Sequence, residues 1–250
     1  MALEINLDGK VALVTGGTRG IGKSISDQLL KAGARVLATG TNAEEIEKLN
    51  TLCTIENLKY VQLNLNDPKS VKDFISQTIV TEDIDILINN AGINIVDQAL
   101  DITVNDFKKI QEVNVHGPFL LSQALGKRMV EKGWGRIVNI SSIWSVVTRP
   151  GRLAYSTSKM ALLGINKTFA IEWAKYNVLV NCVSPGFTLT ELTATTNTEN
   201  ELKIIENKIP QNRLAMPEEI ANGVLFLASN LNSYLVGQNI TIDEIGRAHV

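Results

Sequence analysis

The stretch "KVALVTGGTRGIG", Lys10–Gly22, joins a short apolar run to a glycine-rich turn, and it decides the fold class. A run of Val, Ala and Leu is typical of a strand that is buried on both faces. Gly16, Gly20 and Gly22 allow the backbone to turn tightly and to approach a pyrophosphate, whose charge would face the positive end of the helix that follows. A strand, a glycine turn and a helix in this order predict a dinucleotide-binding unit.

The rest of the chain repeats this alternation of apolar strands and amphipathic helices. The helical patterns cover 22–32, 103–131, 155–176 and 217–228. The other predicted strands are 35–39, 59–63, 84–89, 136–140, 178–183 and 239–242. Apolar strands separated by helices indicate a parallel sheet covered on both faces, and right-handed crossovers make it doubly wound. We therefore predict one Rossmann-like α/β domain over 1–243 with about seven strands, and a site at their carboxyl ends.

Composition limits the classes of function that the chain can have. With 250 residues, of which 44% are hydrophobic and 20% charged, the chain can form one large domain. A net charge of −2 leaves no basic surface for nucleic acid, and no run of 18 apolar residues predicts a membrane span. Cys53 and Cys182 form neither a disulfide framework nor a metal-binding spacing. We expect no metal, and a protein of a reducing, cytoplasmic compartment.

The end of the second predicted strand bears on the choice of cofactor. A site selective for NAD(H) usually places an acidic residue there to bind the ribose 2′-hydroxyl. Here the segment is "ATGTN", with Gly40 and Thr41 in that place, so a 2′-phosphate would not be repelled. Arg19 in the glycine turn can pair with this phosphate through its guanidinium. The sequence therefore favours NADP(H) over NAD(H).

A second short stretch, "LAYSTSKMALLG", pairs a phenol with an ammonium. Tyr155 precedes Lys159 by four residues, so both side chains project from the same face of a helix. By itself this pair is equally compatible with a surface helix, because a motif of two residues often occurs by chance.

Six ordered motifs remove that ambiguity. Through these motifs the sequence resembles the short-chain dehydrogenase/reductase superfamily from about Gly9 to Asp243. Within it, the chain is most similar to the bacterial β-ketoacyl-acyl-carrier-protein reductases and their polyol- and sugar-dehydrogenase relatives. The motifs are "TGGTRGIG" (Thr15–Gly22), "NNAG" (Asn89–Gly92), Asn114, "NISS" (Asn139–Ser142), "YSTSK" (Tyr155–Lys159) and "PGFTLT" (Pro185–Thr190).

The resemblance implies four catalytic residues. Tyr155 would protonate a carbonyl oxygen as hydride arrives, and Lys159 would lower the pKa of this phenol and bind the nicotinamide ribose. Ser142 would donate a hydrogen bond to the substrate oxygen. Asn114 would hold a water that connects Lys159 to solvent. A non-catalytic dinucleotide sensor remains an alternative, although such a protein would be free to lose these residues.

The resemblance also implies the cofactor contacts. Asn90 would lie against the adenine-side ribose, and Asn64, where many relatives have Asp, would lie near the adenine. Pro185, Gly186 and Thr188 would orient the nicotinamide. The full expected set is Gly16, Thr18, Arg19, Gly20, Ile21, Gly22, Gly40, Thr41, Asn64, Leu65, Asn90, Ala91, Gly92, Tyr155, Lys159, Pro185, Gly186, Thr188 and Thr190.

The substrate is less well defined, and two classes stay open: a carbonyl thioester on a carrier protein, or a sugar or polyol. Gly133 and Tyr176 stand where we would align the arginines with which carrier-protein reductases often meet their partner. Arg149 and Arg152, just before Tyr155, could meet a phosphate, a carboxylate or solvent. The expected pocket residues are Ile93, Asn94, Ser142, Trp144, Leu153 and Phe187. The polar, threonine-rich segment 187–214 is the least regular part of the pattern, and we expect an irregular, mobile segment over the site.

Two further expectations concern assembly and the chain end. The long helices 103–131 and 155–176 carry more apolar residues than one face against a sheet requires, which predicts a homo-oligomer, as in the family a tetramer. After Asp243 the family normally continues into a pair of glycines. Here 244–250 match a translation of the sequencing-adapter text GAG-ATC-GGA-AGA-GCA-CAC-GTC. We expect these residues to be a non-native, exposed tail.

Overall fold

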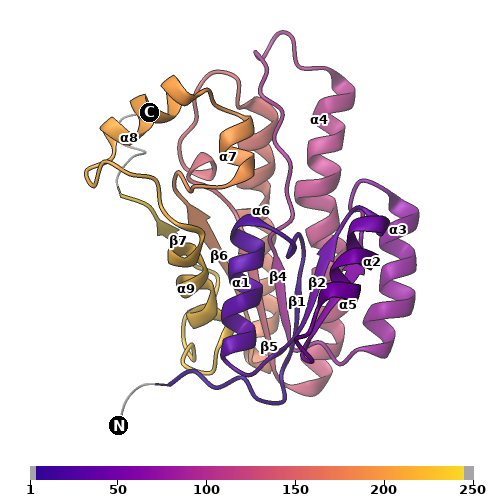
Figure 1. Cartoon of the computed structure of the whole chain (residues 1–250). Helices are drawn as coiled ribbons and strands as arrows, with labels where there is room; N and C mark the ends of the chain where they lie inside the picture. Colours follow the sequence, from indigo (N-terminus) through magenta and orange to yellow (C-terminus); the bar gives the residue numbers. More distant parts are fainter. Residues whose placement is uncertain (1–3, 245–250) are drawn as a thin grey trace.

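The computed structural model describes residues 4–244, and they form a seven-stranded sheet in which every neighbouring pair is parallel (Figure 1). The strand order is β3-β2-β1-β4-β5-β6-β7. The strands are β1 (Val11–Val14), β2 (Arg35–Gly40), β3 (Leu58–Gln62), β4 (Ile86–Asn89), β5 (Gly135–Ile140), β6 (Val178–Pro185) and β7 (Asn239–Ile242). The order reverses direction between β1 and β4, which is where a doubly wound sheet binds its ligands. The predicted fold class is confirmed.

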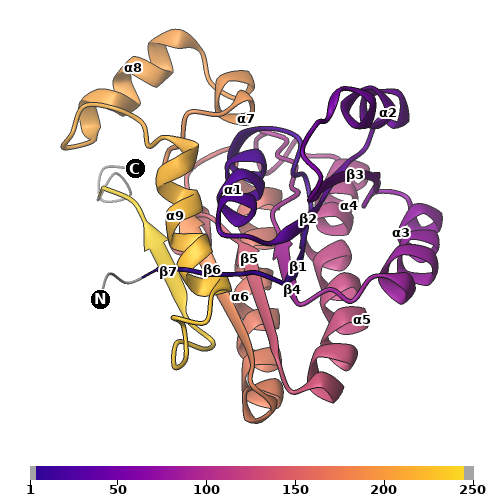
Figure 2. The same ribbon diagram turned by 60° about the horizontal axis from the view of Figure 1, so that its bottom comes forward.

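Helices cover both faces of the sheet. Figure 2 shows α1 and α9 lying side by side on one face, where their apolar residues pack on the strands. On the opposite face α3, α5 and α6 contribute to a second core. The helices are α1 (Gly20–Lys31), α2 (Ala43–Leu52), α3 (Pro68–Phe74), α4 (Val104–Gln111), α5 (Gly117–Lys132), α6 (Leu153–Trp173), α7 (Glu191–Thr195), α8 (Glu199–Lys208) and α9 (Pro217–Ala228).

The long helix expected over 103–131 contains a change of helical pitch. Between α4 and α5, residues Glu112–His116 form a π-helical turn, η2, so the chain stays helical but gains an extra residue in one turn. Another π-helical turn, η1 (Ile75–Ile79), follows α3. Insertions of this kind occur frequently at functional sites, and η2 contains Asn114.

The segment 187–214 is more regular than its composition predicted. It forms α7 and α8, which project beyond the carboxyl end of the sheet (Figure 1). Thr190 and Thr198 cap the two helices by accepting hydrogen bonds from backbone N–H groups, which explains why a threonine-rich sequence becomes helical here. Ile205, Ile209 and Leu214 form a small core of their own. The expectation of an irregular segment is therefore wrong.

The suspected tail begins at a residue that makes a contact. Glu244 is half-buried and accepts a hydrogen bond from the backbone N–H of Gln211 (3.0 Å), so this first position is not the exposed residue that was expected. The other positions, 245–250, lie outside the described residues. Within 4–244, none of the helices has the length and apolar content needed to cross a membrane.

Candidate active site

The glycine turn after β1 is closed tightly against the end of β4. Gly16 and Gly20 have positive φ angles of 63° and 53°. A Cβ atom on Gly22 would lie 2.1 Å from the carbonyl oxygen of Gly16, so only glycine fits there. The Asn90 amide donates to the carbonyl oxygens of Thr15 (2.9 Å) and Gly16 (3.1 Å). The turn is thus preformed, and the Asn90 amide supports it from behind; the contact of Asn90 with the adenine-side ribose stays a prediction.

The turn also reaches the end of β2 and the covering segment. A Cβ on Gly40 would lie 3.0 Å from the Thr18 side chain, so the acid-free end of β2 packs directly on the turn. Arg19 is 72% exposed and pairs with Glu191 of α7 (3.1 Å). The methyl group of Thr190 is the nearest atom to a Cβ built on Gly20 (3.5 Å). The glycine turn and the start of α7 therefore face each other.

Tyr155 and Lys159 lie one turn apart on α6, against the end of β5. Lys159 is 3% exposed, and its ammonium donates to the carbonyl oxygen of Ile140 (2.8 Å). Its Nζ lies 5.5 Å from the centre of the Tyr155 ring. Ser141 Oγ donates to the carbonyl oxygen of Lys159 (3.1 Å), so β5 and α6 are joined twice. These two hydrogen bonds fix how far α6, and with it the Tyr155 phenol, lies above the sheet.

The electrostatics of these groups follow from burial. Burial raises the pKa of Tyr155 to about 12, against the opposing effects of a hydrogen bond with Ser142 and the charge of Arg152. Burial also lowers the pKa of the Lys159 ammonium to about 8. The direction for Tyr155 is opposite to the one expected from a neighbouring ammonium, because burial is the larger influence. The phenol is therefore held in its acid form.

Ser142 begins a short 3₁₀ turn, η3 (Ile143–Ser145), directly after β5. Its Oγ accepts a hydrogen bond from the backbone N–H of Trp144 (3.3 Å). One acceptor position of the hydroxyl is thereby used, and its hydrogen remains free to point toward Tyr155 or a substrate oxygen. Ser142 lies near enough to Tyr155 to act on its pKa, and the hydrogen bonds that both would make to a substrate oxygen stay a prediction.

Asn114 is buried in η2, and its amide is fully engaged with the protein. Its Oδ1 accepts from the backbone N–H of Ile93 (2.9 Å), and its Nδ2 donates to the carbonyl oxygen of Ile93 (2.9 Å) and to Ser158 Oγ (3.0 Å). A Cβ on Gly92 would lie 3.4 Å from Asn114 Oδ1 and 3.5 Å from Lys159 Nζ. Asn114 thus ties the loop after β4 to α6, with a packing role that the sequence did not predict.

The remaining expected cofactor residues lie at neighbouring strand ends. Leu65 is buried against Gly117, whereas Asn64 is partly exposed after β3 and holds the turn through the N–H of Asn66. A Cβ on Gly186 would lie 2.2 Å from Asp243 Oδ1, so a side chain at this position would have to displace the Asp243 carboxylate. The other members, Ile21, Thr41, Ala91, Pro185 and Thr188, occupy the ends of β1, β2, β4 and β6 or the segments that follow them.

The expected pocket residues are partly gathered. Trp144 is buried and meets Phe187 edge-on, with ring centres 6.0 Å apart. Ile93 and Asn94 follow β4, and the buried Oδ1 of Asn94 has no hydrogen-bond partner within 4–244. Leu153 is exposed at the start of α6. Trp144 and Phe187 thus form an apolar wall beside Ser142, and Asn94 keeps one buried acceptor after β4.

Sequence reasoning missed several polar residues behind the site. Thr15 Oγ1 accepts from the N–H groups of Asn90 (2.9 Å) and Ala91 (3.0 Å). Asn89 donates to Asn139 (2.8 Å) and Ser122 (3.0 Å) beneath the strand ends. Asparagines at the ends of adjacent strands were the available signal, since buried amides need partners.

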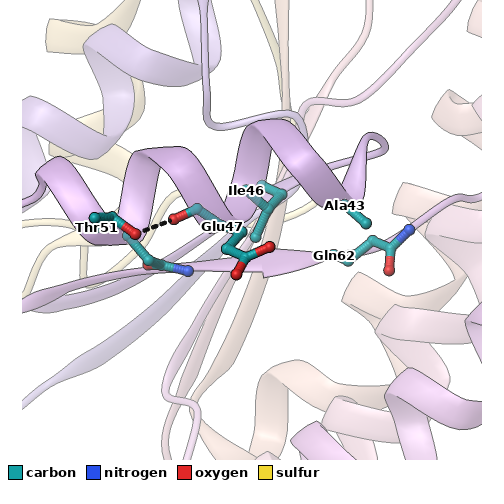
Figure 3. A pocket seen from close by; sticks show the side chains of 6 residues that line it. Ala43, Ile46, Glu47, Thr51 and Gln62 are labelled. Carbon is teal, nitrogen blue, oxygen red and sulfur yellow. Dashed lines mark hydrogen bonds between the residues drawn. The ribbon is translucent and has the colours of Figure 1, made fainter.

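A hollow of about 540 Å³ lies apart from these groups, between α2 and β3 (Figure 3). Ala43, Ile46 and Gln62 contribute to it, and the hydroxyl of Thr51 is used locally by a bond to the Glu47 carbonyl oxygen (2.9 Å). None of the expected site residues lines it, so we do not associate it with the chemistry.

A doubly wound sheet with a preformed glycine turn, and a Ser–Tyr–Lys group at its switch point, defines a dinucleotide-dependent oxidoreductase that acts on hydroxyl and keto groups. Comparison with known proteins shows to which family of such oxidoreductases the chain belongs. A profile of short-chain dehydrogenases, described as enoyl-(acyl carrier protein) reductase, matches residues 16–244. The chain belongs to the short-chain dehydrogenase/reductase superfamily, as the motifs predicted.

Two relatives with 36% sequence identity or more are named as reductases. The chain is 42% identical to 3-oxoacyl-[acyl-carrier-protein] reductase FabG of Aquifex aeolicus over 96% of this chain and 98% of that protein. It is 36% identical to the corresponding Rickettsia prowazekii protein, covering 96% and 97%. Among solved structures it resembles a gluconate 5-dehydrogenase from Burkholderia cenocepacia in complex with NADP and tartrate, with 28% identity, a TM-score of 0.91 and 98% of each chain covered.

Proposed function

We propose that this chain uses NADPH to reduce the 3-keto group of an acyl thioester to a hydroxyl group. The observation that carries the proposal is the grouping of Ser142, Tyr155 and Lys159 where β5 meets α6. Lys159 Nζ lies 5.5 Å from the centre of the Tyr155 ring, and Ser142 acts on the Tyr155 pKa. Trp144, two residues after Ser142, packs on Phe187. An apolar surrounding suits an acyl chain better than a polyhydroxylated sugar. The relatives named as 3-oxoacyl reductases support the same substrate class.

The residues at the glycine turn fit NADP(H). The turn presents backbone to a pyrophosphate at the N-terminus of α1, and the end of β2 carries no acid that would repel a 2′-phosphate. Arg19 is exposed enough to exchange Glu191 for that phosphate. When bound, NADPH supplies the hydride that is added to the carbonyl carbon.

The chain's own residues handle the proton. Tyr155, kept protonated by burial, gives its phenolic proton to the carbonyl oxygen as negative charge develops there. Ser142 donates a hydrogen bond to the same oxygen, since its acceptor side is engaged by Trp144. Lys159 uses one N–H on Ile140, which leaves two for ribose hydroxyls and for a water that reprotonates the phenolate. Asn114 positions this group by fixing the loop after β4.

A sugar or sugar-acid dehydrogenase is the second candidate. It is favoured by one local observation, the buried Trp144 flanked by Arg149 and Arg152, whose guanidinium carbons lie 5.4 and 5.6 Å from the ring centre. Aromatic faces and arginines are suited to polar, anionic ligands. The gluconate dehydrogenase neighbour supports this alternative.

A substrate panel separates the two candidates. NADPH oxidation is followed at saturating cofactor with acetoacetyl thioesters of coenzyme A and N-acetylcysteamine, and with 5-ketogluconate and fructose. The proposal expects kcat/KM for the thioesters to exceed that for the keto-sugars by at least about 10-fold, and Tyr155→Phe to abolish turnover of both classes. Preference for the keto-sugars would establish the second candidate instead.

The proposal extends to the assembly and location of the chain. A groove of about 590 Å³ between α5 and α6 is bordered by Gly126, Trp173 and Ile171, and Ile171 is 82% exposed. A second copy would cover this apolar surface, which supports a homotetramer. Light scattering tests this, with Ile171→Glu expected to give smaller species and a monomeric native chain contradicting it. Free thiols at Cys53 and Cys182 suit the cytoplasm.

A further inference from the structure

Two arginines stand beside the proposed reaction site without taking part in the proposed chemistry. Arg149 and Arg152 belong to the loop between η3 and α6, and both guanidinium groups lie over the Trp144 ring. Arg152 is the N-cap residue of α6, three positions before Tyr155, and its charge acts on the Tyr155 phenol. They therefore lie close to the atoms that a substrate must approach.

Arg152 is buried without a partner. It is only 3% exposed, its Nε is buried with no hydrogen-bond acceptor, and among residues 4–244 no carboxylate forms an ion pair with it. Arg149 donates to Asn197 Oδ1 (3.2 Å), a neutral acceptor, and likewise has no ion pair in that range. Buried arginines are normally paired, so this one requires an explanation.

The local surroundings make the position more costly still. Arg149 is a like charge close enough to act on Arg152, and together with burial it lowers the Arg152 pKa. The guanidinium also stands at the N-terminus of a 21-residue helix, the positive end of its dipole. Among the residues that the structure describes, Glu201 is the carboxylate whose charge acts on Arg152, and its Oε2 is already bound to the N–H and hydroxyl of Thr198.

The structure assigns to Arg152, with Arg149 beside it, the binding of an anionic group that the substrate carries in addition to its keto group. A carboxylate or a phosphate can accept two parallel hydrogen bonds from a guanidinium, and would neutralise the buried Arg152 charge, whose Nε has no acceptor within 4–244. The indole of Trp144 holds the two guanidinium groups in place. This inference rests on the proposed reduction of a ketone at Ser142 and Tyr155, and it narrows the substrate class.

The test compares related ketones with and without an anionic group. NADPH-dependent kcat/KM is measured for acetoacetate against methyl acetoacetate, and for dihydroxyacetone phosphate against dihydroxyacetone. The native chain is expected to prefer the charged member of at least one pair by about 10-fold or more, and the pair that shows this identifies carboxylate or phosphate. Arg152→Gln should remove the preference, with the neutral ketone changed less than about 3-fold. Lys48→Gln, an exposed lysine on α2, is the control for loss of one charge.

A second measurement is independent of turnover. Acetoacetate and dihydroxyacetone phosphate are titrated by calorimetry into the chain saturated with NADP⁺, which cannot react with a ketone. Binding should weaken about 10- to 150-fold in Arg152→Gln. The Tm of this variant should not fall, because it removes an uncompensated buried charge, whereas a merely structural arginine would give a lower Tm.

The outcomes separate the inference from the proposed function. If thioesters are reduced but neither charged ketone is preferred, or if Arg152→Gln slows charged and neutral ketones equally, the anionic subsite is wrong and the reductase stands. A second outcome is that no ketone or thioester is reduced, yet a charged ketone binds the NADP⁺ complex and Arg152→Gln abolishes this binding. The proposed reaction is then wrong and the subsite stands.

Discussion

Gly22→Ala tests whether the close packing of the glycine turn forms the cofactor cradle. The added Cβ would lie 2.1 Å from the Gly16 carbonyl oxygen and 2.4 Å from Asn90 Nδ2, at least 1 Å short of the 3.4 Å at which ordinary contact begins. Both neighbours are held in place, Gly16 by its positive φ and Asn90 by two hydrogen bonds. The start of α1 must therefore move away from the turn.

The cost follows from that displacement. Overpacking of this kind costs about 1–3 kcal/mol, which for a chain of this size lowers the Tm by about 2–12 °C. The same movement draws the N–H groups of the turn away from the pyrophosphate, and a loss of about 1.4 kcal/mol there weakens NADPH binding about 10-fold. Differential scanning fluorimetry measures the first effect and NADPH fluorescence titration the second.

Lys23→Ala provides the matched control on the adjacent residue. It removes only the exposed Lys23–Asp27 pair (2.6 Å), worth about 0.5 kcal/mol, so NADPH affinity should stay within about 2-fold. If Gly22→Ala bound NADPH as tightly as the native chain and melted at the same temperature, the assignment of this turn as the cofactor cradle would be refuted.

Three further predictions concern the chemistry. Tyr155→Phe should lower turnover by at least about 10²-fold while NADPH affinity changes only a few-fold, because only the proton donor is lost; stopped-flow turnover near the native rate would remove Tyr155 from that role. Arg19→Ala should weaken NADPH about 10- to 150-fold and NADH hardly at all, and Glu191→Gln should not weaken NADPH; equal losses for both cofactors in Arg19→Ala would contradict a 2′-phosphate contact. Burial lowers the Lys159 pKa to about 8, so kcat/KM for reduction should fall as pH rises above about 8 and the ammonium is lost. Lys159→Arg should move this alkaline fall of the pH profile to higher pH. If the fall stays at the same pH, it belongs to another group.

Most of the fold could be predicted from the sequence because its signals are local. Apolar runs such as Val178–Val183 and helical patterns such as Pro217–Ala228 reflect burial that each segment carries in its own composition. The helices over 187–214 escaped prediction because their stability comes from threonine caps and a small core that forms only after Ile205 and Leu214 meet. The π-helical turn at Asn114 likewise has no local signature.

For the site, the sequence by itself determined which residues we propose for the chemistry. Tyr155, Lys159, Ser142 and the glycines stand in ordered motifs whose spacing is set along the chain. Tertiary structure alone decided how those groups are tuned. Burial, which is a property of the whole packed molecule, raises the pKa of Tyr155 and lowers that of Lys159. Long-range contacts likewise make Asn90 and Asn114 support neighbouring loops, and within 4–244 they leave the buried Arg152 Nε without an acceptor. Which strands and helices meet decides each hydrogen-bond partner, and no local sequence pattern records that meeting.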